Sequence, residues 1–230
     1  MTGRRSLGAW LLVLFATSAY AQSSDSPAPR AHHVTISAGG LWSGPYSIGD
    51  ATAALRSNAP GTTPAPFTLF STESTIDSAA GVSVLAGFTL TPSITIEGGA
   101  SFSRPSLATQ IAQDAEQAAG AEVSEPLQQY VFEAGAVWHL PLHFGSRARL
   151  FASGGGGYLR QLHQERTLVE TGRVYYAGTG LNVWLRGGHG PTKSLGLRTD
   201  VRANWRQDGI EFGDKTRVFA TVTLLLFVGL

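Results

Sequence analysis

Residues 217–230 alternate between apolar and other side chains over their whole length. Every second position is aliphatic or alanine, so a strand here has one continuous apolar face. That face comprises Val218, Ala220, Val222, Leu224, Leu226, Val228 and Leu230. A strand that crosses a membrane within a β-barrel needs ~9–11 residues with an uninterrupted lipid-facing side. The pattern therefore predicts the last strand of a transmembrane β-barrel.

Seven further segments show the same alternation. They span residues 32–42, 82–90, 94–102, 130–140, 147–158, 174–186 and 195–205. The connections between the eight segments are alternately long (43–81, 103–129, 159–173 and 206–216) and short (91–93, 141–146 and 187–193). This arrangement predicts an all-β fold, an eight-stranded antiparallel up-and-down transmembrane β-barrel. Its long loops are external, and its short turns and both termini lie on the periplasmic side.

The charged residues within these segments fall on the polar face, among Gly, Ser, Thr and Asn. They are Glu97, Glu133, Arg149, Arg198, Asp200 and Arg202. The aliphatic positions carry no charge, as a lipid-facing surface requires, because an Arg or Lys at the bilayer midplane costs ~2–4 kcal/mol. We therefore expect the aliphatic face to meet lipid and the six charged residues to form a paired network in a narrow lumen. A soluble lipocalin-like barrel, the alternative, would have its aliphatic face inside.

The first 21 residues have the features of a secretory signal peptide. Arg4 and Arg5 make the start basic, residues 7–16 are apolar, and Ala19 and Ala21 fit the small-x-small rule for cleavage before Gln22. An apolar run of about 10 residues is too short for a membrane-spanning helix, which needs ~20. We expect residues 1–21 to be removed and residues 22–230 to form one barrel domain.

The composition agrees with a membrane barrel and argues against nucleic-acid binding, a disulfide framework and lipid attachment at cysteine. Charged residues make up 14% of the chain, whereas soluble domains contain about 25%. Without Arg4 and Arg5 the chain has 15 basic and 16 acidic residues, so it lacks the basic surplus with which proteins bind nucleic acids. Cysteine is absent, so neither a disulfide framework nor lipid attachment at cysteine is available.

The signal, the Leu-Thr-Pro-Ser-Ile-Thr hairpin at 90–95 and the terminal strand resemble the small eight-stranded outer-membrane barrels of Gram-negative bacteria. This porin-like group includes the OmpA transmembrane domain and OmpX. The resemblance covers the whole mature chain. It implies a place in the cell outer membrane, contact with outer-membrane lipids, and recognition of the C-terminal strand by the barrel assembly machinery. The family usually ends in phenylalanine, whereas here Leu230 is last and Phe227 has inward parity.

The sequence offers no strong motif for catalysis, a cofactor or a metal. Residues 154–157 are four glycines without a following Gly-Lys-Ser/Thr, and glycine in a strand more often permits curvature or close packing against an aromatic ring. Pro141 lies between His139 and His143 and forbids the helix that would make their spacing a metal site. Some outer-membrane barrels of similar size are enzymes that modify lipid A through a serine–histidine pair at the outer lipid boundary. No His-x-Ser motif lies on an expected strand here, and His163 falls in an expected loop. We expect a non-enzymatic protein without cofactor or metal.

The long connections are the expected working surface, for contact with the environment or with an unknown extracellular or envelope partner. Residues 106–120 have helical composition, which predicts a short external helix capped by Ser106. Residues 67–72 alternate and could extend the second strand above the membrane. Three alternatives remain: a small gated ion pathway through the lumen, a lipid A-modifying enzyme, and a soluble periplasmic ligand-binding barrel. A general diffusion pore is excluded, because water-filled channels need ~16–18 strands.

Overall fold

The structure is a computed structural model that describes residues 33–56, 66–112, 121–145, 147–163, 168–186, 194–210 and 216–230. The predicted signal peptide, its cleavage before Gln22 and the predicted turn at 187–193 lie outside the described residues. The described residues contain no helix long and apolar enough to cross a bilayer.

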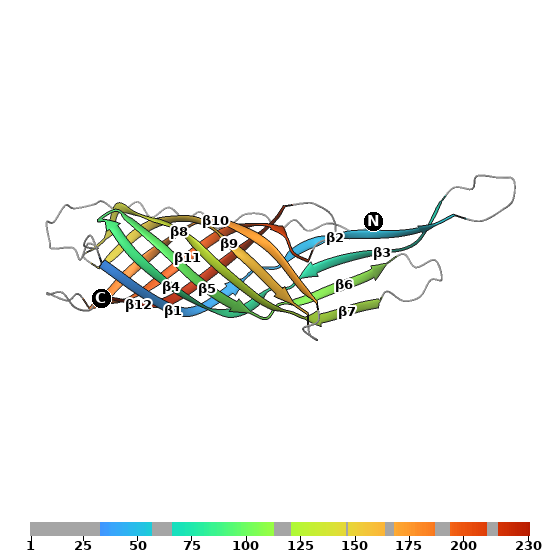
Figure 1. Ribbon diagram of the computed structural model, residues 1–230, viewed down its shortest axis with the longest axis horizontal. Coiled ribbons are helices and arrows are strands. Elements are labelled where there is room, and N and C mark those ends of the chain that lie inside the picture. The colour runs from blue at the N-terminus through green and yellow to red at the C-terminus, as the bar shows by residue number, and fades with distance from the viewer. Residues whose placement is uncertain are drawn as a thin grey trace.

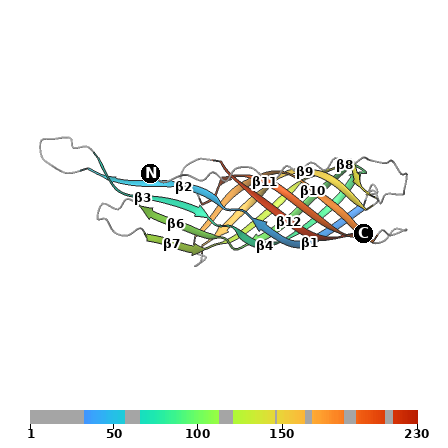
Figure 2. The same cartoon turned by 180° about the vertical axis from the view of Figure 1, so that it is seen from behind.

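Eight strands form a closed antiparallel barrel (Figure 1). They are β1 (His33–Ser43), β4 (Ala79–Thr91), β5 (Ile94–Ser103), β8 (Gln128–Phe144), β9 (Ala148–Leu162), β10 (Val169–Arg186), β11 (Leu195–Asp208) and β12 (Arg217–Gly229). Around the wall the order is β1-β12-β11-β10-β9-β8-β5-β4, and β1 also pairs with β4. The seam between β1 and β12 runs from the pair Thr35–Gly229 to the pair Ser43–Thr221 and is seen in Figure 2. The predicted eight-stranded barrel is confirmed.

Strand β8 is longer than expected. The segment 141–146 was expected to be a tight turn, but the strand continues to Phe144. The pairing with β9 shifts in register between His139 and His143, which absorbs Pro141. Proline has no backbone N–H to donate, and an irregularity of this kind is where a strand tolerates it.

The aliphatic side of each strand faces outward. Exposed side chains on the barrel wall include Ile36, Val84, Ile96, Val201, Leu224 and Leu226, and the buried side chains on the opposite face include Ser37, Ser83, Glu97, Arg198, Asp200 and Thr223. A soluble lipocalin-like barrel would have its aliphatic side chains inside and its polar side chains outside, so the structure contradicts that alternative. An apolar exterior with every backbone group paired in a closed sheet is what the hydrocarbon of a bilayer demands.

Four exposed aromatic side chains lie on the part of the wall nearest the long connections. Trp42, Tyr158, Tyr175 and Trp205 are 38–48% exposed and lie on β1, β9, β10 and β11. Rings that are apolar at one end and polar at the other collect at the boundary between lipid and water. This belt therefore marks the outer boundary of the membrane-spanning wall.

A second, four-stranded sheet extends from the barrel at the end opposite the C-terminus (Figure 1). Its strands are β2 (Tyr46–Leu55), β3 (Phe67–Ile76), β6 (Ser106–Ala112) and β7 (Ala121–Pro126), in the order β2-β3-β6-β7. The expected strand at 67–72 is present as part of β3, but β3 belongs to this second sheet and ends two residues before β4 begins.

The expected helix at 106–120 is wrong for its described part. Residues 106–112 form strand β6, and 113–120 lie outside the described residues. Helical composition is a weak preference that tertiary pairing overrides. Here β6 pairs with β3 on one side and β7 on the other, and these two partners hold it extended.

An apolar cluster, here called the Tyr46 cluster, joins this sheet to the mouth of the barrel. It consists of Tyr46, Ile48, Ile76, Leu127 and Phe219. The rings of Tyr46 and Phe219 stack with centroids 4.7 Å apart. Since Phe219 faces inward on β12 and Tyr46 begins β2, the cluster closes the mouth and fixes the root of the sheet above it.

Candidate functional site

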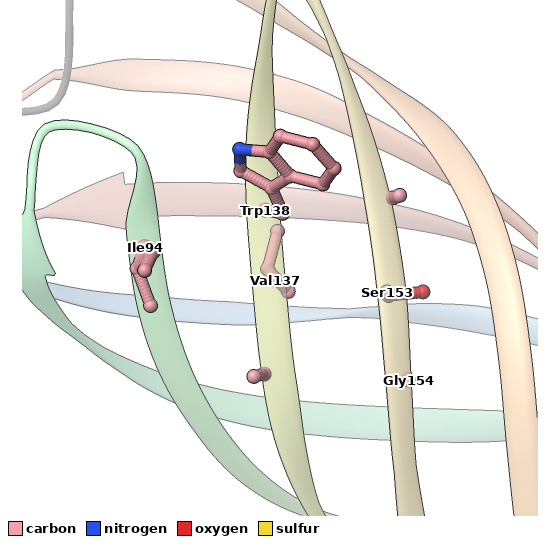
Figure 3. A pocket seen from close by; sticks show the side chains of 7 residues that line it. Ile94, Val137, Trp138, Ser153 and Gly154 are labelled. Carbon is pink, nitrogen blue, oxygen red and sulfur yellow. The ribbon is translucent and has the colours of Figure 1, made fainter.

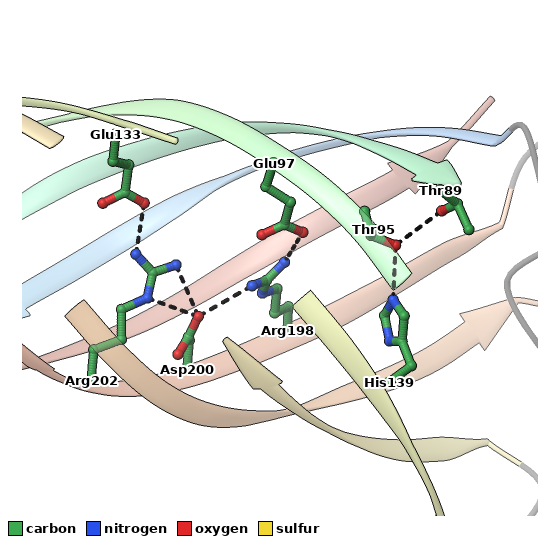
Figure 4. Close-up of polar contacts among 8 residues, drawn as sticks. All are labelled: Thr89, Thr95, Glu97, Glu133, His139, Arg198, Asp200 and Arg202. Carbon is green, nitrogen blue, oxygen red and sulfur yellow. Dashed lines mark hydrogen bonds and ion pairs between the residues drawn. The ribbon is translucent and has the colours of Figure 1, made fainter. Parts of the chain in front are cut away.

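Five of the six charged residues expected in the lumen form one chain of ion pairs across the barrel (Figure 4). Arg198 Nη1 lies 2.5 Å from Glu97 Oε1, and Arg198 Nη2 lies 3.2 Å from Asp200 Oδ2. Arg202 Nη2 lies 3.0 Å from the same Asp200 oxygen, and Arg202 Nη1 lies 2.6 Å from Glu133 Oε1. Asp200 therefore bridges the two arginines, each of which also holds one glutamate.

Strand geometry explains how these residues meet. Arg198, Asp200 and Arg202 alternate along β11, so all three point into the lumen. In the closed order β11 lies directly across the barrel from β5, which carries Glu97. The pair Arg198–Glu97 thus spans the lumen. Asp200 is fully buried, and a barrel of eight strands has an interior just wide enough for side chains to fill.

Two aromatic rings support the arginines from β9 and β10. The Arg198 guanidinium carbon lies 4.4 Å from the centroid of the Phe151 ring, and that of Arg202 lies 4.4 Å from the Tyr176 ring. Cations over ring faces are attracted by the ring quadrupole. A side chain at Gly155 would meet the Tyr176 hydroxyl at 2.7 Å. One of the four consecutive glycines therefore makes room for an aromatic ring, as expected.

Arg149 lies apart from these ion pairs. Its guanidinium donates hydrogen bonds of 3.1–3.2 Å to the backbone carbonyls of Leu140, Pro92 and His139. Two of these carbonyls belong to the periplasmic end of β8, and that of Pro92 belongs to the turn after β4. Among the described residues Arg149 forms no ion pair, because no carboxylate side chain faces the lumen at that level. Its contacts tie the periplasmic turns to the wall.

Thr89, Thr95 and His139 form a short chain of hydrogen-bonded side chains near Arg149 (Figure 4). Thr95 Oγ1 is 3.0 Å from His139 Nε2 and 3.1 Å from Thr89 Oγ1. A histidine beside a hydroxyl is one component of a nucleophilic site. All three side chains are buried inside the barrel, however, so this contact satisfies buried polar groups. No group of three or more metal-binding side chains is found in the described part of the chain.

Arg206 sits at the external mouth and was missed from the sequence. Its side chain is fully buried and donates hydrogen bonds to the Tyr46 hydroxyl (2.9 Å) and to the carbonyls of Asp208 and Ile210 (2.9 and 2.7 Å). Burial raises the pKa of the Tyr46 hydroxyl, and the Arg206 charge partly opposes this. Parity was the available signal, because Arg206 follows Arg198 and Arg202 on the inward face of β11.

Apolar side chains share the periplasmic half of the lumen with Arg149 and His139. The rings of Trp184 and Phe227 meet edge to face with centroids 5.8 Å apart, and Leu225 beside them is fully buried. The inward parity expected for Phe227 agrees with its burial. With the Tyr46 cluster above and these rings below, the ion pairs are enclosed at both ends.

Comparisons with known proteins bear on the fold. No protein-family model and no curated protein sequence matches the chain. The outer membrane protein OprG from Pseudomonas aeruginosa superposes with a TM-score of 0.51 at 10% identity, over 90% of this chain and 99% of that one. The fold is that of an outer-membrane β-barrel.

Two other solved barrels are less similar. The attachment invasion locus protein Ail of Yersinia pestis, in complex with the heparin analogue sucrose octasulfate, matches with a TM-score of 0.44 at 12% identity, over 87% of this chain and 99% of that chain. The outer membrane protease OmpT from Escherichia coli matches with a TM-score of 0.35 at 8% identity, over 89% of this chain and 98% of that chain. Both scores are too low to carry an argument. The closed barrel and its lipid-compatible exterior place this protein in the outer membrane.

Proposed function

We propose that this protein is a non-catalytic integral outer-membrane barrel whose working surface is the sheet β2-β3-β6-β7. The observation that supports this most is the sheet itself, which projects beyond the barrel mouth on the side of the long connections (Figure 1). Loops and extensions held on a rigid scaffold are the usual carriers of binding. Here the scaffold is the closed barrel, and packing in the Tyr46 cluster attaches the sheet to it.

The edges and side chains of the sheet suit contact with another surface. In the described part of the chain, β2 and β7 each pair with one strand only, so each has one open edge of backbone donors and acceptors. Exposed strand edges readily pair with other chains unless Lys or Pro protects them. Residues 50–55 of β2 contain neither. Phe70 and Val123 are 38% and 58% exposed on this sheet, as is common at contact surfaces.

The test is to shorten the β2–β3 hairpin without touching the barrel. Asp50 and Glu73 face each other across the two strands, so an Asn-Gly turn can replace residues 51–72. We expect production of the full protein to make bacteria attach to protein-coated surfaces and aggregate with one another, and production of the shortened protein to do neither. The matched control replaces Pro92-Ser93 of the periplasmic turn by Asn-Gly. Unchanged attachment with the shortened hairpin would refute the proposal.

A small gated ion pathway is a second candidate, and the shared carboxylate supports it. Because Asp200 accepts hydrogen bonds from both arginines, the network could exchange partners and open. The double variant Glu133→Ala/Arg198→Ala should raise single-channel conductance in planar bilayers if the lumen conducts. The exposed Arg147→Ala serves as a control. Equal conductance for all three proteins would eliminate the pathway.

The non-catalytic part of the proposal rests on the burial of the Thr95–His139 contact inside the lumen. A lipid A-modifying enzyme would need its reactive groups at the lipid boundary. Unchanged lipid A masses in cells that overproduce the protein are expected. A new lipid A species that disappears in a His139→Ala variant would contradict it.

The third element of the proposal concerns assembly. We expect the barrel assembly machinery to recognise β12, which carries the outward aliphatic face of residues 218–228 and forms the seam with β1. A strand that closes the barrel last is free to pair with another protein until closure.

A further inference from the structure

Two arginines stand together on the outward face, directly above the aromatic belt. Arg173 on β10 is opposite Tyr158 on β9, and Arg160 on β9 is opposite Thr171. Residues directly opposite share a face of the sheet, and Tyr158 faces outward, so Arg160 and Arg173 do too. Both are exposed, and they are diagonal neighbours, a spacing of ~7–8 Å that long side chains bridge.

Arg104 extends this pair to the neighbouring strands. It follows β5, and its guanidinium carbon lies 5.5 Å from the centroid of the Phe102 ring. Phe102 in turn contacts the Tyr130 ring at 4.9 Å, and Tyr130 is opposite Arg160. The three arginines, here called the rim arginines, thus line the outer edge of the wall from β5 to β10.

The described part of the chain offers the rim arginines no acidic partner. In the described residues none of the three takes part in an ion pair. The outward positions around them are Gln128, Tyr130, Phe132, Leu162, Val169, Thr171 and Gln207, without a carboxylate. Arg160 and Arg173, which lie side by side at the membrane boundary, repel each other and favour an anion that bridges them.

The wall beneath the rim arginines carries small side chains. The outward positions of β8 and β9 below them are small: Ala134, Ala136, Ala152, Gly154 and Gly156. At the lower end of this strip a groove of about 380 Å³ opens between β5, β8 and β9, with Ile94 and Trp138 as its walls (Figure 3). Figure 3 shows the Trp138 ring standing out from the strand beside the small residues of β9. An apolar strip of this kind accommodates an extended hydrocarbon chain.

We propose that this side of the barrel binds a phosphate-bearing lipid of the outer leaflet. Arg160 and Arg173 hold the phosphate, Arg104 adds a third charge, and an acyl chain lies along the small-residue strip. Guanidinium groups bind phosphate through two parallel hydrogen bonds, which gives a defined geometry as well as charge. The leaflet follows from the strand ends, because the rim arginines lie on the side of the long connections. This inference rests on the membrane placement of the barrel but not on the role of the projecting sheet.

The test measures lipid retained by the purified, folded barrel in detergent, by native mass spectrometry. The probes are bisphosphorylated lipid A, phosphatidylglycerol and inorganic phosphate. We expect bisphosphorylated lipid A to bind the wild type more tightly than phosphatidylglycerol does, and inorganic phosphate not to bind; tighter binding of phosphatidylglycerol would contradict the assignment to the outer leaflet. Arg160→Gln/Arg173→Gln should weaken binding by about fivefold per arginine. Arg147→Gln, which removes an exposed arginine at the periplasmic end, should leave binding unchanged.

A second variant tests the strip without altering charge. Gly154→Leu fills the floor of the groove and should also weaken lipid binding. All variants must keep the faster mobility of an unboiled barrel on a detergent gel, which separates loss of the site from loss of the membrane fold. The inference is overturned if the double arginine variant binds lipid as well as the wild type does, if Arg147→Gln loses as much, or if inorganic phosphate binds as tightly as the lipids.

Discussion

At the scale of single residues, the ion pair between Arg198 and Glu97 is the contact that spans the lumen. Replacing Arg198 by Gln leaves Glu97 and Asp200 buried without one of their partners. Removing one member of a buried pair costs about 3–5 kcal/mol, whereas removing both is often nearly neutral. We therefore expect Arg198→Gln to lower the free energy of unfolding by about 3–5 kcal/mol, measured by urea unfolding from lipid vesicles.

The double variant Glu97→Gln/Arg198→Gln provides the control for this prediction. It should recover much of the lost stability, because neither charge is then left unpaired across the lumen. If the single and double variants unfold at the same urea concentration, the pair contributes no coupling and the network is not a structural support.

The alternation of residues along each strand predicted which charged side chains face the lumen. It could not predict which of them would form ion pairs with one another. Alternation along one strand suffices to place Arg198, Asp200 and Arg202 on one face. Which of them meets Glu97 or Glu133 depends on which strands lie opposite each other and on their stagger in the closed barrel. The separate position of Arg149 has the same origin, since the stagger brings it to backbone carbonyls at the periplasmic end.

At the scale of elements, β12 depends on its outward face remaining uncharged along its whole length. Leu224 lies at the middle of this strand and is 56% exposed on the wall, while Leu230 follows the strand's periplasmic end. An Arg on the lipid face costs ~2–4 kcal/mol at the bilayer midplane and ~0–1 kcal/mol near the interface. Leu224→Arg should therefore destabilise the folded barrel by about 2–4 kcal/mol and Leu230→Arg by less than about 1 kcal/mol.

Urea-driven release from phospholipid vesicles, followed by tryptophan fluorescence, measures both variants. Equal costs at the two positions would mean that β12 does not cross the bilayer as the wall geometry requires.

The barrel strands could be predicted because lipid and lumen impose opposite chemistry on alternate residues. The projecting sheet stands outside the hydrocarbon, where that contrast is weaker. The sequence of β6 therefore predicted a helix, because Leu107 and Ile111 have helical spacing. In the structure Leu107 pairs with Ile76 and packs against the Tyr46 cluster, a contact set by β3 and not by the local sequence.

At the scale of the whole molecule, the barrel is defined by closure of the seam between β1 and β12. Gly39 on β1 is opposite Leu225, and a Cβ added at Gly39 would come within 2.8 Å of the Leu225 Cα and collide with the Leu224 carbonyl oxygen. Neither atom can move without opening the seam, because both belong to the β12 backbone. A Cβ at the adjacent Gly40 would meet nothing within 4 Å.

These two glycines test closure in a matched pair. Gly39→Val should prevent closure, so that the unboiled protein loses its faster-running band and its resistance to protease in the outer-membrane fraction. Gly40→Val adds the same side chain one residue later on the lipid-facing side and should keep both properties, since an aliphatic residue suits that surface. The two variants differ only in the face of β1 on which the new side chain lies. If Gly39→Val closed and Gly40→Val did not, the assignment of the inner and outer faces of the wall would have to be reversed.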